Sequence, residues 1–122
     1  MIPVSIANDG TVKKADITKS WYNYTNKQWA NVVLVTKDTR EKHITEVGDT
    51  VIPSADILAY LVWIPRYSYA IPSGTGARAI SIKFGYTKVA KENGTATGTS
   101  YLTHPGFTFG TNELNGLWVG KF

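Results

Sequence analysis

The chain has 122 residues, the usual size of one domain and enough to bury roughly two-thirds of the unfolded surface. It contains no cysteine, which excludes disulfides, thiolate metal sites and cysteine chemistry. The formal charge of +4 comes from 13 basic and 9 acidic residues spread along the chain, and this dispersal argues against a nucleic-acid partner. No apolar run approaches the roughly 18 residues of a membrane-spanning helix, so the sequence predicts no membrane span.

Residue usage favours strands and turns. Seven tyrosines, four tryptophans and eleven glycines accompany many valine, isoleucine and threonine residues. We therefore expect a mainly β fold over 1–122: a single small domain of antiparallel hairpins and sheet, with at most one short helix near 54–61. Two N-terminal hairpins would occupy 1–36 and the main sheet 57–122, and the segment is compatible with a place in a longer protein.

Two hairpins are predicted first along the chain. Ile2–Ile6 reads as a strand, and Asn8-Asp9-Gly10 is a tight-turn signal before the next strand, Thr11–Ala15. In the second hairpin, Trp21 and Trp29 flank a polar turn that leads into an apolar stretch. They are expected to form a cross-strand pair that fixes the hairpin on the core or, alternatively, to stack on a ligand.

The middle of the chain is predicted as a loop, a short helix and a long strand. Lys37–Thr50 is polar and reads as a loop, after which Ser54 resembles a helix N-cap. Tyr60–Ile71 reads as a strand with apolar residues on both faces as far as Ile64, and Pro65 predicts a bulge or an edge.

The last third is predicted to contain two further strands and a loop. Ala79–Tyr86 alternates, and we expect Ile80, Ile82, Phe84 and Tyr86 to face inward. Lys91–Ser100 has no large apolar residue and is predicted to be an exposed loop. Leu117–Phe122 is predicted to be a paired strand that contributes to the core or to a contact between subunits. The expected main core joins Trp63, Ile82, Phe84 and Trp118.

Residues that could perform catalysis are few. His43 lies in the predicted polar loop with no acidic or histidine residue recognised at metal-ligand spacing, and His104 precedes a proline, where a structural hydrogen bond in a turn is expected. No phosphate-binding, dinucleotide-binding or nucleophile motif is present. The sequence therefore predicts no enzyme, no catalytic residue, no metal site and no cofactor.

The candidate ligand-binding residues are aromatic, with one arginine among them. Arg66 interrupts an aromatic strand, where it is expected to form a structural cation–π or salt-bridge contact or, alternatively, to bind a ligand. The full candidate set is Trp21, Tyr24, Trp29, Arg66 and Tyr69, and the residues proposed for assembly are Leu117, Trp118, Val119 and Phe122.

Four sequence blocks carry a resemblance to a known family. They are WYNY…WAN from Trp21, VWIPRY from Val62, HPGFTFG from His104 and LNGLWVGKF from Leu114. In this order they resemble an uncharacterised family of surface proteins from Firmicutes, their phages and related gut bacteria. The resemblance covers most of the chain and implies an extracellular, cell-surface or virion location.

A weaker resemblance concerns the strand Val62–Pro65 and the terminal strand Trp118–Phe122. They are similar to the opening of formylglycine-generating-enzyme-like domains, which have a C-type-lectin-like fold. The catalytic forms use cysteines that this chain lacks, so no activity is carried over. We therefore expect a non-catalytic structural or adhesion module, a phage-particle or pilus-like component that assembles with itself or with a structural partner. The alternative is a carbohydrate-binding module for a cell-surface glycan.

Overall fold

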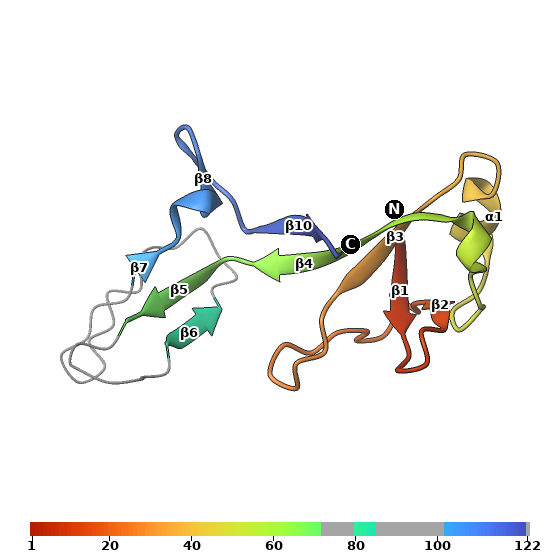
Figure 1. Ribbon diagram of the computed structural model, residues 1–122, viewed down its shortest axis with the longest axis horizontal. Helices are drawn as coiled ribbons and strands as arrows, with labels where there is room; N and C mark the ends of the chain where they lie inside the picture. The colour runs from red at the N-terminus through yellow and green to blue at the C-terminus, as the bar shows by residue number, and fades with distance from the viewer. Residues whose placement is uncertain (72–79, 85–101, 122) are drawn as a thin grey trace. The chain divides into compact units, whose positions relative to one another are not determined.

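The computed structural model describes residues 1–71, 80–84 and 102–121 (Figure 1). Their strands pair antiparallel, which confirms the predicted mainly β fold. By its internal contacts the chain forms two compact units, Met1–Trp63 with Trp118–Phe122, and Ile64–Leu117. No helix in the described ranges is long and apolar enough to span a membrane.

The largest sheet has five strands in the order β10-β4-β3-β1-β2. Their bounds are Ile2–Ile6 for β1, Val12–Lys14 for β2, Asn31–Val35 for β3, Ile57–Pro65 for β4 and Gly116–Gly120 for β10. The predicted first hairpin is confirmed, with Gly10 at a φ of 85° in its turn and Asp9 accepting a hydrogen bond from the Thr11 N–H. β1, β2 and β3 come from the segment 1–36 and share this sheet with β4 and β10 from the segment 57–122.

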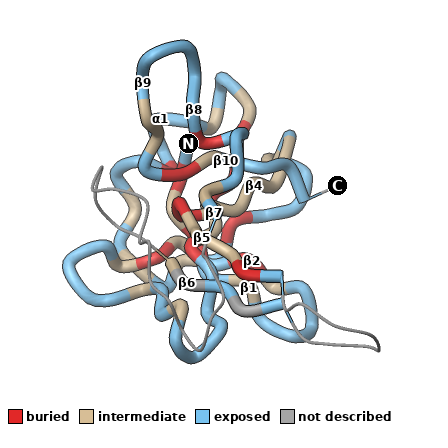
Figure 2. The backbone as a smooth tube through the Cα atoms, turned by 90° about the vertical axis from the view of Figure 1, so that its left-hand side faces the viewer, coloured by how far each residue is buried: buried red, intermediate tan, exposed pale blue. Residues whose placement is uncertain are grey.

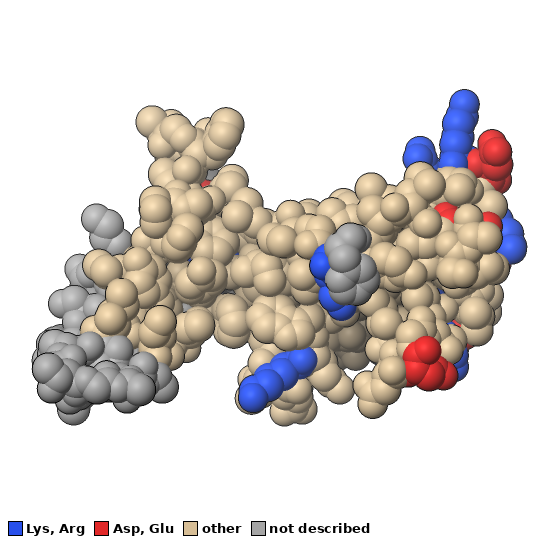
Figure 3. Space-filling model, viewed as in Figure 1, with Lys and Arg blue, Asp and Glu red and all other residues tan. Residues whose placement is uncertain are grey.

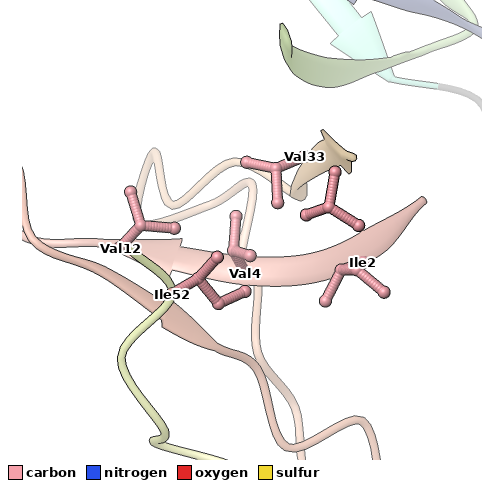
Figure 4. Packing of buried hydrophobic residues seen from close by; sticks show 6 residues of the cluster. Ile2, Val4, Val12, Val33 and Ile52 are labelled. Atoms are coloured by element: carbon pink, nitrogen blue, oxygen red, sulfur yellow. The ribbon is translucent and has the colours of Figure 1, made fainter. Parts of the chain in front are cut away.

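The core of the first unit lies on one face of this sheet. Register pairs Ile2 with Val33 and Ile6 with Val12, so alternate residues of neighbouring strands point to the same side. Figure 4 shows the resulting cluster around β1, and Figure 2 marks buried positions in red. The buried members are Ile2, Val4, Val12, Val33, Val35 and Ile52. Burying each such side chain contributes about 1.5–3 kcal/mol.

The predicted main core is therefore wrong. Ile82 is 54% exposed and Trp118 is 37% exposed, while Phe84 is half-buried. Ile80, also expected to face inward, is 57% exposed, and Tyr86 lies outside the described residues. Alternation identifies the two faces of a strand, but which face other elements cover is decided by tertiary packing.

A short helix, α1 (Arg40–Thr45), occupies the segment predicted to be a loop. Lys14 Nζ donates hydrogen bonds to the carbonyls of Ile44 and Glu46, at the helix C-terminus where a cation is favourable. The helix also buries His43 completely. These contacts come from other elements, so the polar composition of the segment did not indicate a helix.

The helix predicted near 54–61 is a single 3-10 turn, η1 (Ser54–Asp56). Its N-cap is Pro53 and not Ser54. Ile57 already begins β4, which pairs with β3 and takes up the apolar residues assigned to the helix. The spacing of these residues fits both structures, and pairing with a buried neighbouring strand favours β.

The second unit contains two small sheets. One has the order β6-β5-β7 and the other pairs β8 with β9. Their bounds are Tyr67–Ala70 for β5, Ser81–Phe84 for β6, Leu102–Thr103 for β7, Thr108–Phe109 for β8 and Asn112–Glu113 for β9, with a 3-10 turn, η2, at Pro105–Phe107. Phe107 and Ala70 are buried, and the Tyr67 ring lies 5.2 Å from that of Phe107.

The strand predicted over Tyr60–Ile71 is two strands separated at Arg66. β4 ends at Pro65, which has no N–H to donate to a ladder. The loop predicted at Lys91–Ser100 lies outside the described residues. The predicted C-terminal strand is confirmed as far as Gly120, because β10 is paired with β4 in the sheet.

Candidate functional site

A row of aromatic rings precedes β3 in the first unit. A tight turn, closed by the bridge between Asn23 and Gln28 and by Lys27 at a φ of 58°, holds the segment. Successive ring centroids are 5.4 Å apart for Trp21 and Tyr22, 5.3 Å for Tyr22 and Tyr24, and 5.4 Å for Tyr24 and Trp29. The segment predicted to be a second hairpin therefore has one bridge and a row of packed rings. The ring that packs against Trp29 is that of Tyr24.

A second aromatic pair lies on neighbouring strands of the same unit. The rings of Trp63 in β4 and Trp118 in β10 have centroids 5.2 Å apart. The Tyr24 hydroxyl donates to the Trp63 carbonyl at 3.4 Å, and the Trp63 N–H donates to the Ala30 carbonyl at 2.9 Å. The first bond joins the row of rings to the Trp63–Trp118 pair. The second joins β4 to Ala30, the residue that follows Trp29. We call the six residues the aromatic surface: Trp21, Tyr22, Tyr24, Trp29, Trp63 and Trp118.

The aromatic surface contains all four tryptophans of the chain and is partly open to solvent. Tyr22 is 41% exposed and Trp29 38% exposed, and the other rings of the row are half-buried beneath them. Large aromatic side chains that are held by packing yet remain accessible lose little conformational entropy on contact. This arrangement is typical of a surface that binds another molecule.

The rings are steeply inclined to one another. The interplanar angles along the row are 88°, 51° and 75°, and that of the Trp63–Trp118 pair is 59°. No two successive rings in these contacts share a plane. An extended sugar platform needs faces that lie in a common direction, whereas a protein partner can interdigitate with edges and faces alike.

The structure brings part of the predicted ligand set together. Trp21, Tyr24 and Trp29 are consecutive members of the aromatic surface, whereas Arg66 and Tyr69 belong to the second unit. Sequence reasoning missed Tyr22 and placed Trp63 in the core. The adjacent aromatic letters at 21–24 were a signal for Tyr22, but nothing local indicated the contact between Trp63 and Trp118.

The predicted assembly residues lie on β10 as far as the structure describes them. Leu117 is half-buried, Trp118 is part of the aromatic surface and Val119 is 43% exposed. Phe122 lies outside the described residues. The exposed apolar side chains therefore belong to the second half of the strand.

Arg66 forms the structural salt bridge that was one of its two predicted roles. The side chain is 6% exposed, and its Nη2 lies 3.1 Å from Glu113 Oε1. Its backbone N–H donates to the Asn115 carbonyl at 2.8 Å, while Nη1 has no hydrogen-bond partner. Tyr69 is half-buried on β5, with its ring 6.5 Å from that of Tyr67. Both residues contribute to the packing of the second unit.

The two histidines have structural contacts. His43 Nδ1 lies 2.7 Å from Glu46 Oε2 and its Nε2 lies 2.9 Å from Asp56 Oδ2. The ring joins α1 to η1, and within the described residues no three potential ligands are arranged to hold a metal ion. His104 Nδ1 accepts a hydrogen bond from the Gly106 N–H at 3.1 Å, which confirms the predicted structural role.

The carboxylates with perturbed acidity belong to turns. Hydrogen bonds from the Thr18 hydroxyl, from Lys19 and from the Thr18 N–H lower the pKa of Asp16 to about 2. Hydrogen bonds from Thr11 lower the pKa of Asp9 in the first hairpin. Each carboxylate accepts hydrogen bonds from residues just after it in the chain, a pattern typical of turn stabilisation.

Charged side chains on the face shown in Figure 3 stand apart or beside opposite charges. Lys19 pairs with Asp16 at 3.0 Å, and Lys42 lies 3.8 Å from Glu46. A phosphate-binding surface usually gathers lysine and arginine along one stripe. The described charges do not form such a stripe on this face.

The chain matches no family model, no curated protein and no solved structure. Its function is therefore inferred from the sequence and the geometry of its own residues.

Proposed function

We propose that this chain is a non-catalytic structural or adhesion module, located outside the cell or on a virion, that assembles with copies of itself or with a structural partner protein. The observation that carries the proposal is the aromatic surface: six packed rings in one compact unit, with Tyr22, Trp29 and Trp118 each about two-fifths exposed. The location is supported by the four sequence blocks and their resemblance to bacterial and phage surface proteins.

Tryptophan and tyrosine dominate the binding energy of protein interfaces, because they bury large areas while fixing few rotatable bonds. Here Tyr22 and Trp29 are also held in place by neighbouring rings before any partner binds. Such preorganisation reduces the entropy lost on association. Truncating one of these rings should therefore weaken a protein contact strongly.

A carbohydrate-binding module is the second candidate. The exposed rings of Tyr22 and Trp29 could each offer one face to a pyranose ring. The inclination of neighbouring rings limits such stacking to single sugar units, which makes this candidate the weaker one.

The test compares Trp29→Ala with a matched control, Phe109→Ala. Phe109 is 78% exposed in the second unit and lies outside the aromatic surface. Self-association is measured by sedimentation velocity over a range of concentrations, with circular dichroism melts to confirm folding. We expect Trp29→Ala to weaken association by about 30-fold, which corresponds to the loss of about 2 kcal/mol at a hot-spot residue. Phe109→Ala should leave the association unchanged.

Two outcomes would count against the proposal. A wild-type chain that stays monomeric at every concentration, and whose tryptophan fluorescence shifts with a glycan, would favour carbohydrate binding. Equal association of wild type and Trp29→Ala would show that the aromatic surface is not the contact.

A further inference from the structure

The two edges of the five-stranded sheet differ in how far other residues cover their backbone groups. At one edge, β2 is covered by the segment before η1: the Lys14 N–H donates to the Thr50 carbonyl at 2.8 Å, and the Asp49 N–H donates to the Lys14 carbonyl at 2.8 Å. β2 also carries Lys13 and Lys14, and lysine on an edge discourages pairing with another chain. This edge is therefore protected.

The other edge is β10, whose neighbour in the sheet is β4. The Lys121 N–H donates to the Tyr60 carbonyl at 2.9 Å, so the backbone groups of Lys121 face β4. Because backbone groups alternate in direction along a strand, the N–H and C=O of Gly120 and Trp118 face away from β4. Among the described strands β10 stands at the end of the sheet, so no strand pairs with these outward groups, and none of the described turn, loop or side-chain hydrogen bonds involves them. They can pair with a further strand.

The exposed part of β10 lacks the usual protection of an edge. Trp118, Val119 and Gly120 are all exposed, and none is charged or a proline. A Cβ added at Gly120 would have nothing within 4 Å, so the space above this residue is open. An exposed, uncharged, apolar edge is a template for strand addition.

We infer that β10 pairs antiparallel with β10 of a second copy, around a twofold axis at Val119, so that two five-stranded sheets become continuous. This inference rests on the proposed function and specifies its mode of assembly. In this register Trp118 lies opposite the partner's Gly120, and Gly120 lies opposite the partner's Trp118. Each pair exchanges both of its outward backbone hydrogen bonds, and the interface closes on itself as a dimer.

The side chains fit this register. The Trp118 ring can cover the partner's Gly120, which has no side chain and open space above it. Lys121 lies opposite the partner's Leu117, so no two lysines face each other. The edge is self-complementary, which favours a second copy over an unrelated strand.

The first experiment compares Gly120→Pro with Gly120→Ala. Proline removes the outward N–H of residue 120 but leaves the hydrogen bond from the Lys121 N–H to the Tyr60 carbonyl. It also restricts the preceding residue, Val119, to the extended conformation that Val119 already has in β10. Alanine keeps the N–H. By sedimentation velocity we expect proline to weaken the dimer at least about tenfold, and alanine much less. Equal dimerisation of Gly120→Pro and wild type would overturn the inference.

The second experiment tests the register in case the proline variant fails to fold. The chain has no cysteine, so Val119→Cys introduces a single thiol. Opposed residues at the axis would have Cα atoms about 4.5 Å apart, within disulfide range. Lys121→Cys is the control, because those thiols would lie more than about 10 Å apart.

The two proposals fail in distinguishable ways. Disulfide-linked dimers of Val119→Cys but not of Lys121→Cys support the inference, and the reverse, or no crosslink in either, overturns it. If Gly120→Pro still associates while Trp29→Ala does not, the proposed function holds and the edge pairing is wrong. A wild-type chain that stays monomeric overturns the edge pairing, and it contradicts the proposed function as well if its tryptophan fluorescence shifts with a glycan.

Discussion

Val33→Ala tests the placement of the core in the first unit. Val33 is 0% exposed at the centre of the five-stranded sheet, opposite Ile2 on one side and Tyr60 on the other. The substitution removes two buried carbon groups, worth about 0.8 kcal/mol each by transfer. A residual cavity of a few tens of Å3 adds up to about 1 kcal/mol. We expect the free energy of unfolding to fall by about 1.5–2.5 kcal/mol.

The matched control is Val47→Ala, which makes the same chemical change at a residue that is 77% exposed. Surface substitutions of this kind change stability by about 0.5 kcal/mol or less. Urea denaturation followed by tryptophan fluorescence gives both values, and the slope should be the same for wild type and the two variants. If the two substitutions cost the same, Val33 does not lie in a packed core.

Two further predictions concern a tryptophan and a turn. Trp63→Ala is expected to lower the free energy of unfolding by about 1–3 kcal/mol, because the ring is half-buried against Trp118. This is less than the cost for a fully buried tryptophan, and a larger loss measured by urea denaturation would place Trp63 in the core. Because the pKa of Asp16 is lowered from 3.8 to about 2 by folding, its contribution to stability is complete above pH 3.8 and lost as the pH falls through about 2. An NMR titration of the carboxyl carbon should show this midpoint, and Thr18→Ala should raise it; a midpoint near 3.8 would contradict the turn geometry.

The local elements were predictable because their signals are local. The turn at Asn8–Gly10 requires a residue at positive φ, and the sequence supplies glycine there. The strand ending at Gly120 is an apolar stretch after a turn, and His104 before a proline is a common capping arrangement. In each case the residues that determine the structure are neighbours in the chain.

The helix at Arg40–Thr45 was not predictable in this way. Six residues are too few for a helical period to show, and an isolated helix of this length is unstable in water. It is held by Lys14 at its C-terminus and by the contact between His43 and Asp56, both from other elements. Such long-range contacts leave no local pattern.

The candidate site likewise contains residues that lie close together in the sequence and residues that only the fold makes neighbours. Trp21, Tyr24 and Trp29 were grouped from the sequence because nine positions contain them all, and a tight turn brings them together. Trp63 and Trp118 come from strands far apart in the chain, and only the pairing of β4 with β10 makes them neighbours. Local spacing grouped three of the rings, and topology determined which other aromatic residues share the surface.

Strand β10 connects the stability of the fold with its proposed assembly. Trp118 packs on Trp63 with its ring, while its outward backbone groups are available to a second copy. A substitution that shortens this side chain would therefore lower both stability and association, and the two effects could not be separated. Gly120 has no side chain to lose, and the proline variant removes only an outward donor. The contribution of the edge can therefore be measured at Gly120 without disturbing the tryptophan pair.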